Sequence, residues 1–143
     1  MLDLVPRPAI SAMSPRAIDN VRRLEEMALT CPQVLIETDH TFHAGMYART
    51  IIIPAGVVLT GALIKIATLL IVSGDALVYV EDGPPLELRG YNVLPAAAGR
   101  KQAFVAQTDV SLTMIFPTQA KTVEEAEEEF TDEADRLFSR KEA

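Results

Sequence analysis

The sequence predicts a mainly β fold, a barrel or sandwich with an N-terminal extended arm and helix and a C-terminal helix. Between residues 50 and 116, short runs rich in Val, Ile, Leu and Thr are separated at near-regular intervals by turn residues, which is typical of an all-β sandwich or barrel. The longest apolar run, residues 66–72, is a strand candidate. The length of 143 residues suits one domain with appendages.

Charge and composition exclude several kinds of partner. A net charge of −7 argues against nucleic acid, because nucleic-acid binding depends on clustered cations. No apolar run approaches the roughly 20 residues of a spanning helix, so we expect no membrane partner. The N-terminus has Asp3 and prolines before any continuous apolar core, so we expect no secretory signal. Cys31, the only cysteine, cannot form an internal disulfide, and we expect it to be small, apolar and buried.

Residues 1–32 are expected to form an N-terminal arm and an amphipathic helix. Pro6 and Pro8 favour an extended conformation over residues 1–13. The arm is too apolar for a solvated tail, so we expect it to dock on a neighbouring subunit or larger assembly, with its own sheet as the alternative. Its apolar residues include Leu2, Leu4, Val5 and Ile10.

A helix is predicted to follow the arm. Ser14 and Pro15 resemble an N-cap followed by proline at the first helical position. Apolar residues then recur at helical spacing to about Leu29. The residues of this stripe are Ile18, Val21, Leu24 and Met27.

Residues 33–117 are expected to form the β domain itself. The pattern predicts a first strand over 33–38, a polar turn with both histidines over 39–45, and a second strand over 46–53. Residues 82–85, Asp-Gly-Pro-Pro, predict a hairpin turn later in the domain.

Residues 118–143 are expected to form an acidic helical segment. Thr122 and Glu125 fit a capping box, and a run of glutamates favours the N-terminal half of a helix. Thr131 and Asp132 offer an alternative, in which a second short helix restarts there. The apolar face of the helix would contain Val123, Ala126, Phe130, Ala134 and Leu137.

The glycine and proline spacing resembles the cupin family, whose jelly roll carries two motifs with metal ligands. In the first motif, a glycine precedes a His-x-His pair and a glutamate, and a second glycine ends the motif. Aligned with this chain, it runs from Gly56 to Gly74. Ala62, Ile64 and Thr68 then stand where the two histidines and the glutamate would be.

The second cupin motif matches in its scaffold and departs in its ligands. Gly90, Pro95 and Gly99 fit the glycines and proline, with shifted gaps. Gln102 takes the histidine position and Ala106 that of the asparagine. The resemblance therefore implies that residues 33–117 form a cupin-like jelly roll whose metal ligands are lost.

The residue chemistry leads to the same expectation. Residues 62–68, read as a strand, place Ala62, Ile64 and Thr68 on one face, and such a lining cannot offset the desolvation of a bare cation. We therefore expect no cofactor and no catalytic residue. A barrel pocket would be formed by Ala62, Ile64, Thr68 and Gln102.

Few other residues are candidates for chemistry. His40 and His43, close to acidic residues, are weak candidates for binding a metal. Lys65 is expected to point outward. Arg100 and Lys101 are expected to form a solvated basic turn, with contact to an acidic neighbour such as the C-terminal helix as the alternative.

The segments MYARTIIIPAG, LTGALIK, LIVSGD and VEDG are similar to small cupin-type proteins of tailed bacteriophages, over roughly residues 40–117. We therefore expect a non-enzymatic, oligomeric structural or interaction protein, with a dimer favoured. The resemblance implies a virion accessory role in decorating or cementing a capsid, with the arm contacting a major capsid or other virion protein, and a location in the virion or host cytoplasm.

Two alternatives stay open. One is a cupin module that binds a small apolar or sugar-like molecule through Thr68 and Gln102. The other is a divergent metal-dependent cupin enzyme that uses His40 or His43 in place of the lost ligands.

Overall fold

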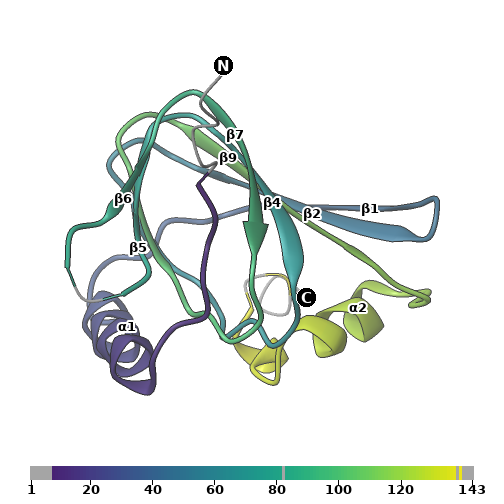
Figure 1. The fold of residues 1–143 in the computed structure, drawn as a ribbon. Coiled ribbons are helices and arrows are strands. Elements are labelled where there is room, and N and C mark those ends of the chain that lie inside the picture. Colours follow the sequence, from purple (N-terminus) through teal and green to yellow (C-terminus); the bar gives the residue numbers. More distant parts are fainter. Residues whose placement is uncertain (1–7, 82, 138, 140–143) are drawn as a thin grey trace, which may run out of the picture.

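The structure is a computed structural model that describes residues 8–81, 83–137 and 139. Two antiparallel β-sheets pack face to face, and helical segments flank them (Figure 1). This confirms the predicted mainly β jelly-roll sandwich. The elements are α1 (Pro15–Ala28), β1 (Thr38–His43), β2 (Met46–Ile53), β3 (Val58–Thr60), β4 (Thr68–Ser73), β5 (Ala76–Tyr79), β6 (Leu86–Leu88), β7 (Tyr91–Ala96), β8 (Ala103–Ala106), β9 (Val110–Pro117), α2 (Val123–Phe130) and the 3₁₀ turn η1 (Ala134–Arg136).

The larger sheet has the strand order β1-β2-β9-β4-β7, and the smaller sheet has the order β3-β8-β5-β6. Strands far apart in sequence are neighbours, since β2 pairs with β9 and β3 pairs with β8. The chain therefore crosses repeatedly between the sheets. β2 has the bounds that the sequence predicted, and β5 and β6 pair across the predicted hairpin.

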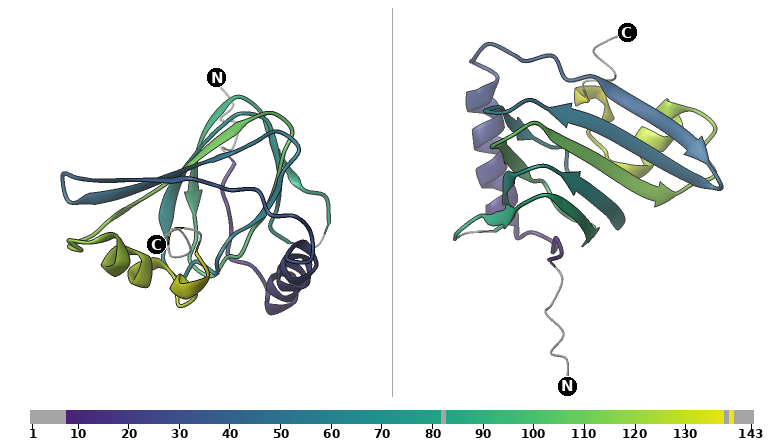
Figure 2. Two further views of the ribbon diagram at one scale, coloured as in Figure 1. Left: turned by 180° about the vertical axis from the view of Figure 1, so that it is seen from behind. Right: turned by 90° about the horizontal axis from the view of Figure 1, so that it is seen from above.

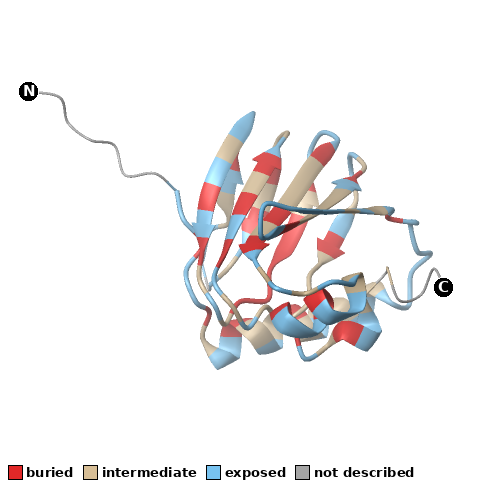
Figure 3. Ribbon diagram, turned by 90° about the vertical axis from the view of Figure 1, so that its right-hand side faces the viewer, coloured by how far each residue is buried: buried red, intermediate tan, exposed pale blue. Residues whose placement is uncertain are grey.

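Strand β4 shows why these segments form a sandwich. Thr68, Leu70 and Val72 are buried between the sheets, whereas Leu69 and Ser73 are exposed on the outer side. Successive side chains of a strand point to opposite faces, so one apolar face per sheet enters the core. Figure 3 shows the same alternation of buried and less buried residues along neighbouring strands.

Helix α1 packs on the smaller sheet and confirms the predicted helix. The Ser14 hydroxyl accepts a hydrogen bond from the Ala17 N–H at 3.1 Å and caps the helix. Ala17 and Val21 pack against Ala103 of β8. Strand β8 is therefore covered on both sides, by the core on one side and by α1 on the other.

The described part of the arm, residues 8–13, extends the edge of the larger sheet. The Ile10 N–H donates to the Pro95 carbonyl at 2.9 Å, and the Ile10 carbonyl accepts from the Ala97 N–H at 2.8 Å. This part lies on its own sheet, which is the alternative that the sequence left open, because Ile10 can complete the edge of β7 and bury its side chain. Outside the described residues lie Leu2, Leu4 and Val5.

The C-terminal segment covers one end of the sandwich. Thr122 caps α2 as predicted, by accepting from the Glu125 N–H at 3.2 Å. The helix ends at Phe130 and the chain restarts as η1, which confirms the alternative of a second short helix. Figures 1 and 2 show α2 beneath the projecting β1–β2 hairpin, where Phe130 contacts Phe116 edge to face. Neither helix in the described chain is long and apolar enough to cross a membrane.

Four local predictions are wrong. Residues 33–37 form an irregular connection, and the histidines lie in strand β1 rather than in a turn, because the turn is confined to Ala44 and Gly45. Residues 61–67 contain only an isolated bridge at Ile64, where a continuous strand was expected. Cys31 is exposed, because it lies in the turn that follows α1.

Gly74 gives a structural reason for the last glycine of the first motif. Its φ is 127°, a conformation that side chains with a Cβ rarely adopt. A Cβ at this position would lie 2.5 Å from the Asp109 carbonyl oxygen. Only glycine therefore fits where the β4–β5 turn approaches the start of β9.

Candidate ligand cavity between the sheets

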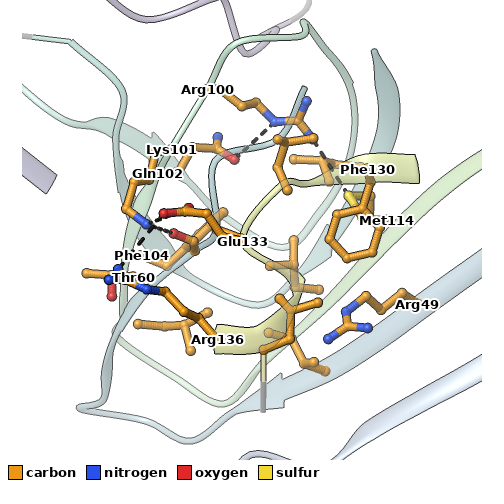
Figure 4. Close-up of a pocket in the computed structure, with 18 of the residues that line it drawn as sticks. Arg49, Thr60, Arg100, Lys101, Gln102, Phe104, Met114, Phe130, Glu133 and Arg136 are labelled. Carbon is orange, nitrogen blue, oxygen red and sulfur yellow. Dashed lines mark hydrogen bonds and ion pairs between the residues drawn. The ribbon is translucent and has the colours of Figure 1, made fainter. Parts of the chain in front are cut away.

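A cavity of about 160 Å³ lies between the two sheets, at the end that the C-terminal segment covers (Figure 4). Both sheets contribute apolar side chains, and Phe130 and Leu137 add to them from the C-terminal segment. The apolar residues from the strands are Ile51, Leu59, Leu70, Phe104, Leu112 and Met114. The charged or amide side chains of the lining are Glu25, Arg49, Arg100, Lys101, Gln102, Glu133 and Arg136.

Arg100 is one of two fully buried cations in this lining, with only 1% of the residue exposed. Each of the five N–H groups of its guanidinium finds an acceptor, and every acceptor is uncharged. The acceptors are Gln102 Oε1 for Nε (3.3 Å), the carbonyl oxygens of Ile66 (3.3 Å) and Ala97 (2.7 Å) for Nη1, and Thr68 Oγ1 (2.7 Å) and Met114 Sδ (3.8 Å) for Nη2.

The charge of Arg100 has no counter-ion among the described residues. No described carboxylate lies within ion-pair distance of its guanidinium. Burial lowers the pKa of Arg100 to about 10, so the side chain remains positive at neutral pH. The cavity wall therefore carries a buried positive charge that only neutral dipoles solvate.

Gln102 supplies a second unusual group beside Arg100. Its Oε1 accepts from Arg100, but its Nε2 is buried without a hydrogen-bond partner among the described residues. The Oγ1 of Thr38, also in the cavity lining, is in the same condition. An unpaired buried amide costs about 1–3 kcal/mol, so these groups suit an acceptor that comes from outside the chain.

Lys101 is equally buried but fully paired. Its Nζ donates to Glu25 Oε2 at 3.0 Å, to the Gly61 carbonyl at 2.9 Å and to Glu133 Oε1 at 3.3 Å. These partners come from α1, from the loop after β3 and from the C-terminal segment. Lys101 therefore joins three parts of the chain at the edge of the cavity.

Glu133 is held in its charged form by these contacts. Burial alone would raise the pKa of Glu133, but the Leu63 N–H, the charge of Lys101 and hydrogen bonds from Arg22 and Lys101 outweigh it and lower the pKa. Its Oε1 accepts from the Leu63 N–H at 2.7 Å, which also fixes the loop before β4.

The remaining cations of the lining also have acidic partners. Arg49 pairs with the buried Glu127 at 2.8 Å, and Arg136 pairs with Glu25 at 3.2 Å. Of the four cationic side chains around the cavity, only Arg100 lacks a carboxylate among the described residues.

The donor set does not fit the divalent metal that the cupin resemblance would imply. Ala62 and Ile64 offer no donor atom, and the Thr68 Oγ1 already accepts from Arg100. A divalent cation here would also lie near an uncompensated guanidinium and be repelled by it. Within the described residues, no group of three or more His, Cys, Asp or Glu side chains is placed to hold a metal.

The structure brings together part of the predicted pocket. Ala62, Ile64 and Gln102 line the cavity, whereas Thr68 is not part of the lining and contacts it only through Arg100. The two histidines lie apart from it, on β1, where His40 Nδ1 hydrogen-bonds the Tyr47 hydroxyl at 2.6 Å. The exposed His43 lies at the end of the same strand.

Sequence reasoning missed the role of Arg100 and Lys101. The predicted solvated basic turn is wrong, because both residues are buried: α1 and the C-terminal segment cover Lys101, and the Arg100 guanidinium contacts Thr68 and Met114 of the larger sheet. The alternative, contact with an acidic neighbour such as the C-terminal helix, holds for Lys101, which pairs with Glu133 of the C-terminal segment. One signal was present: the pair stands beside Gln102, a position that the second motif places inside the barrel.

Comparison with solved structures shows the fold of cupin, or double-stranded β-helix, proteins. The described chain resembles ectoine synthase from P. lautus with a TM-score of 0.51 and 14% identity, over 69% of this chain and 75% of that one. It also resembles a cupin-2 domain from Rhodospirillum rubrum with a TM-score of 0.51 and 11% identity, over 65% and 66% of the two chains.

A larger enzyme contains the same fold. Salicylate 1,2-dioxygenase from Pseudaminobacter salicylatoxidans matches with a TM-score of 0.51 and 15% identity, over 80% of this chain and 35% of that one. Neither a protein-family model nor a curated protein sequence matches this chain. Identities this low establish the fold and leave the function to the site.

Proposed function

We propose that this chain is a non-enzymatic binding module that holds one small molecule in the cavity between its sheets. The observation that carries the proposal is the unpaired, buried Nε2 of Gln102 in the wall of a mostly apolar cavity. Ligand sites combine an apolar lining with a few well-placed polar groups, and this cavity has that composition. A cavity of about 150 Å³ accepts a molecule as large as benzene, which sets the scale of the occupant.

The state of the acidic residues supports binding without catalysis. Glu25 and Glu133, the two carboxylates of the lining, are both engaged by Lys101, and Arg136 pairs with Glu25 as well. A general base needs a pKa near the working pH, whereas the pKa of Glu133 is lowered. The lining therefore positions a ligand better than it moves a proton.

A cavity-filling variant tests the proposal. Ala62 lines the cavity, so Ala62→Leu should displace the ligand, whereas Ala67→Leu adds the same volume at an exposed position of the same loop. Native mass spectrometry of protein purified from its host should show a small-molecule adduct in the parent chain and in A67L, and none in A62L. A parent chain with no adduct, or an adduct that persists in A62L, contradicts the proposal.

We also propose self-association through the outer face of the larger sheet. The outward positions of β2, β9, β4 and β7 carry no charged side chain in the described structure, and several are apolar and exposed. Ile52 and Tyr91 are 60% and 69% exposed. For a chain of net charge −7, an uncharged face allows two copies to meet with the least repulsion.

Sedimentation equilibrium of Ile71→Lys tests this face. Ile71 lies at its centre, between Thr113 of β9 and Val93 of β7 in register. A dimer of the parent chain should dissociate in I71K and persist in Gln107→Lys, which adds the same charge on an exposed turn. A monomeric parent chain contradicts the proposal.

The virion partner and the lack of catalytic activity that the sequence suggests stay predictions.

A further inference from the structure

We infer that the ligand of this cavity is a small carboxylate, held by Gln102 Nε2 and Arg100 Nη2. This inference rests on the proposed binding function and names the chemical class of the ligand. It is drawn from three features of the wall: the charge pairing of its cations, the donors that remain open to an acceptor, and the apolar space beside them.

The charge pairing identifies where a negative group is stabilised. Arg49, Lys101 and Arg136 each lie within 4.0 Å of a described carboxylate, and Arg100 does not. A buried cation surrounded by neutral dipoles has lost its solvation and gains strongly from an anion. A neutral or cationic ligand would leave that charge uncompensated.

The hydrogen-bond donors at Arg100 and Gln102 could each donate to one oxygen atom of a ligand. Gln102 Nε2 has no acceptor in the part of the chain that the structure describes, and the weakest contact of Arg100 is the one from Nη2 to the thioether of Met114, at 3.8 Å. Sulfur is a poor acceptor, so a carboxylate oxygen would replace it with a gain. Gln102 Oε1 accepts from Arg100 Nε at 3.3 Å, so the Gln102 amide lies next to the Arg100 guanidinium, as Figure 4 shows.

The rest of the cavity limits the body of the ligand. Beyond the donors most of the wall is formed by aliphatic and aromatic side chains, among them Leu70, Phe104 and Leu112, and the other charged side chains of the lining are paired with one another or with Glu127. This environment favours an apolar body about the size of a benzene ring and disfavours a second charge. The occupant is therefore a monocarboxylate, and not a phosphate or a sugar.

Matched acids and amides provide the first test. Benzoate and benzamide have the same shape, as do acetate and acetamide, and each pair differs in charge. Titration calorimetry at neutral pH and constant chloride should show at least one acid bound about tenfold or more tightly than its amide. Equal binding of acid and amide overturns the inference but leaves the proposed function intact. Absence of binding by all four probes overturns the inference, and the proposed function fails with it only if native mass spectrometry also shows no adduct. Preferential binding of inorganic phosphate overturns the carboxylate assignment.

Gln102→Glu provides the second test, because it places a carboxylate of the chain itself beside Arg100. The variant should melt about 3 °C or more above the parent chain and lose benzoate binding by at least about tenfold. Gln107→Glu adds the same charge on an exposed turn and should change neither property. Gln102→Met, which only removes the amide, should weaken binding without raising the melting temperature. Unchanged benzoate binding in Q102E overturns the inference.

Discussion

Arg100 and Lys101 are adjacent in sequence and equally buried, but their surroundings are opposite. Lys101 lies between two carboxylates, those of Glu25 and Glu133, whereas Arg100 meets only carbonyl, hydroxyl, amide and thioether groups. Carboxylates of the chain thus neutralise the positive charge of Lys101, whereas no described carboxylate neutralises that of Arg100. Burial alone does not tell what a cation does; its set of partners does.

The comparison divides the cavity wall into a structural end and a binding end. At the structural end, Lys101 joins α1, the loop after β3 and the C-terminal segment through ionic hydrogen bonds. At the binding end, Arg100 is oriented by the Ile66 and Ala97 carbonyls but keeps its charge uncompensated. Substitutions at the two ends should therefore differ in what they change.

The largest expected effect is the loss of Lys101. Lys101→Met leaves Glu25 and Glu133 without the buried cation that lies between them, and only the exposed Arg136 still contacts both, so the free energy of unfolding should fall by about 3–5 kcal/mol. Lys65→Met removes the exposed pair with Asp132 and should cost less than about 1 kcal/mol. Urea unfolding of both variants measures the difference. If K101M lowers the free energy of unfolding no more than K65M does, Lys101 does not have the structural role proposed here.

A smaller effect is expected at Arg100. Arg100→Lys keeps the charge but offers three N–H donors in place of five, so at least two buried acceptors lose their partner. The free energy of unfolding should fall by about 1–3 kcal/mol, less than for K101M. Urea unfolding checks this order. An R100K loss greater than that of K101M would show that Arg100 is the main structural cation, which contradicts the division proposed above.

Much of the fold could be predicted from the sequence, because its signals are local. The apolar run that forms β4, the N-cap at Ser14 and the N-cap at Thr122 each act within a few residues, and the structure has all three. The wrong strand limits near residue 38 and the loop over 61–67 lie where apolar residues occur without a clear period. There, tertiary contacts decide the conformation.

The candidate site could be predicted only in part, because its contacts are remote in sequence. Lys101 meets Glu25 and Glu133 at separations of 76 and 32 residues. No local sequence pattern predicts that α1 and the C-terminal segment will cover the turn that contains Lys101. Gln102 was found because a motif placed it inside the barrel, but its unpaired Nε2 is visible only in the structure.

The smallest effect expected concerns the pH dependence of the structural end. The pKa of Glu133 lies below its usual value of 4.5, because the Leu63 N–H, Lys101 and Arg22 outweigh the effect of burial. A carboxyl group with a lowered pKa in the folded state stabilises the fold fully above its unfolded pKa. That contribution is lost as the pH falls through the folded pKa. Stability should therefore decline below about pH 4.5.

Glu133→Gln isolates this contribution. The amide keeps an oxygen that can accept from the Leu63 N–H but does not titrate, so the decline of the unfolding free energy between neutral pH and about pH 3.5 should be shallower in E133Q than in the parent chain. Glu87→Gln, at a half-exposed site, should keep the parent slope. Benzoate affinity, which depends on the Arg100 end, should change little in E133Q. Equal slopes in all three proteins, measured by urea unfolding across this range, would show that Glu133 is not held by Lys101 as the comparison requires.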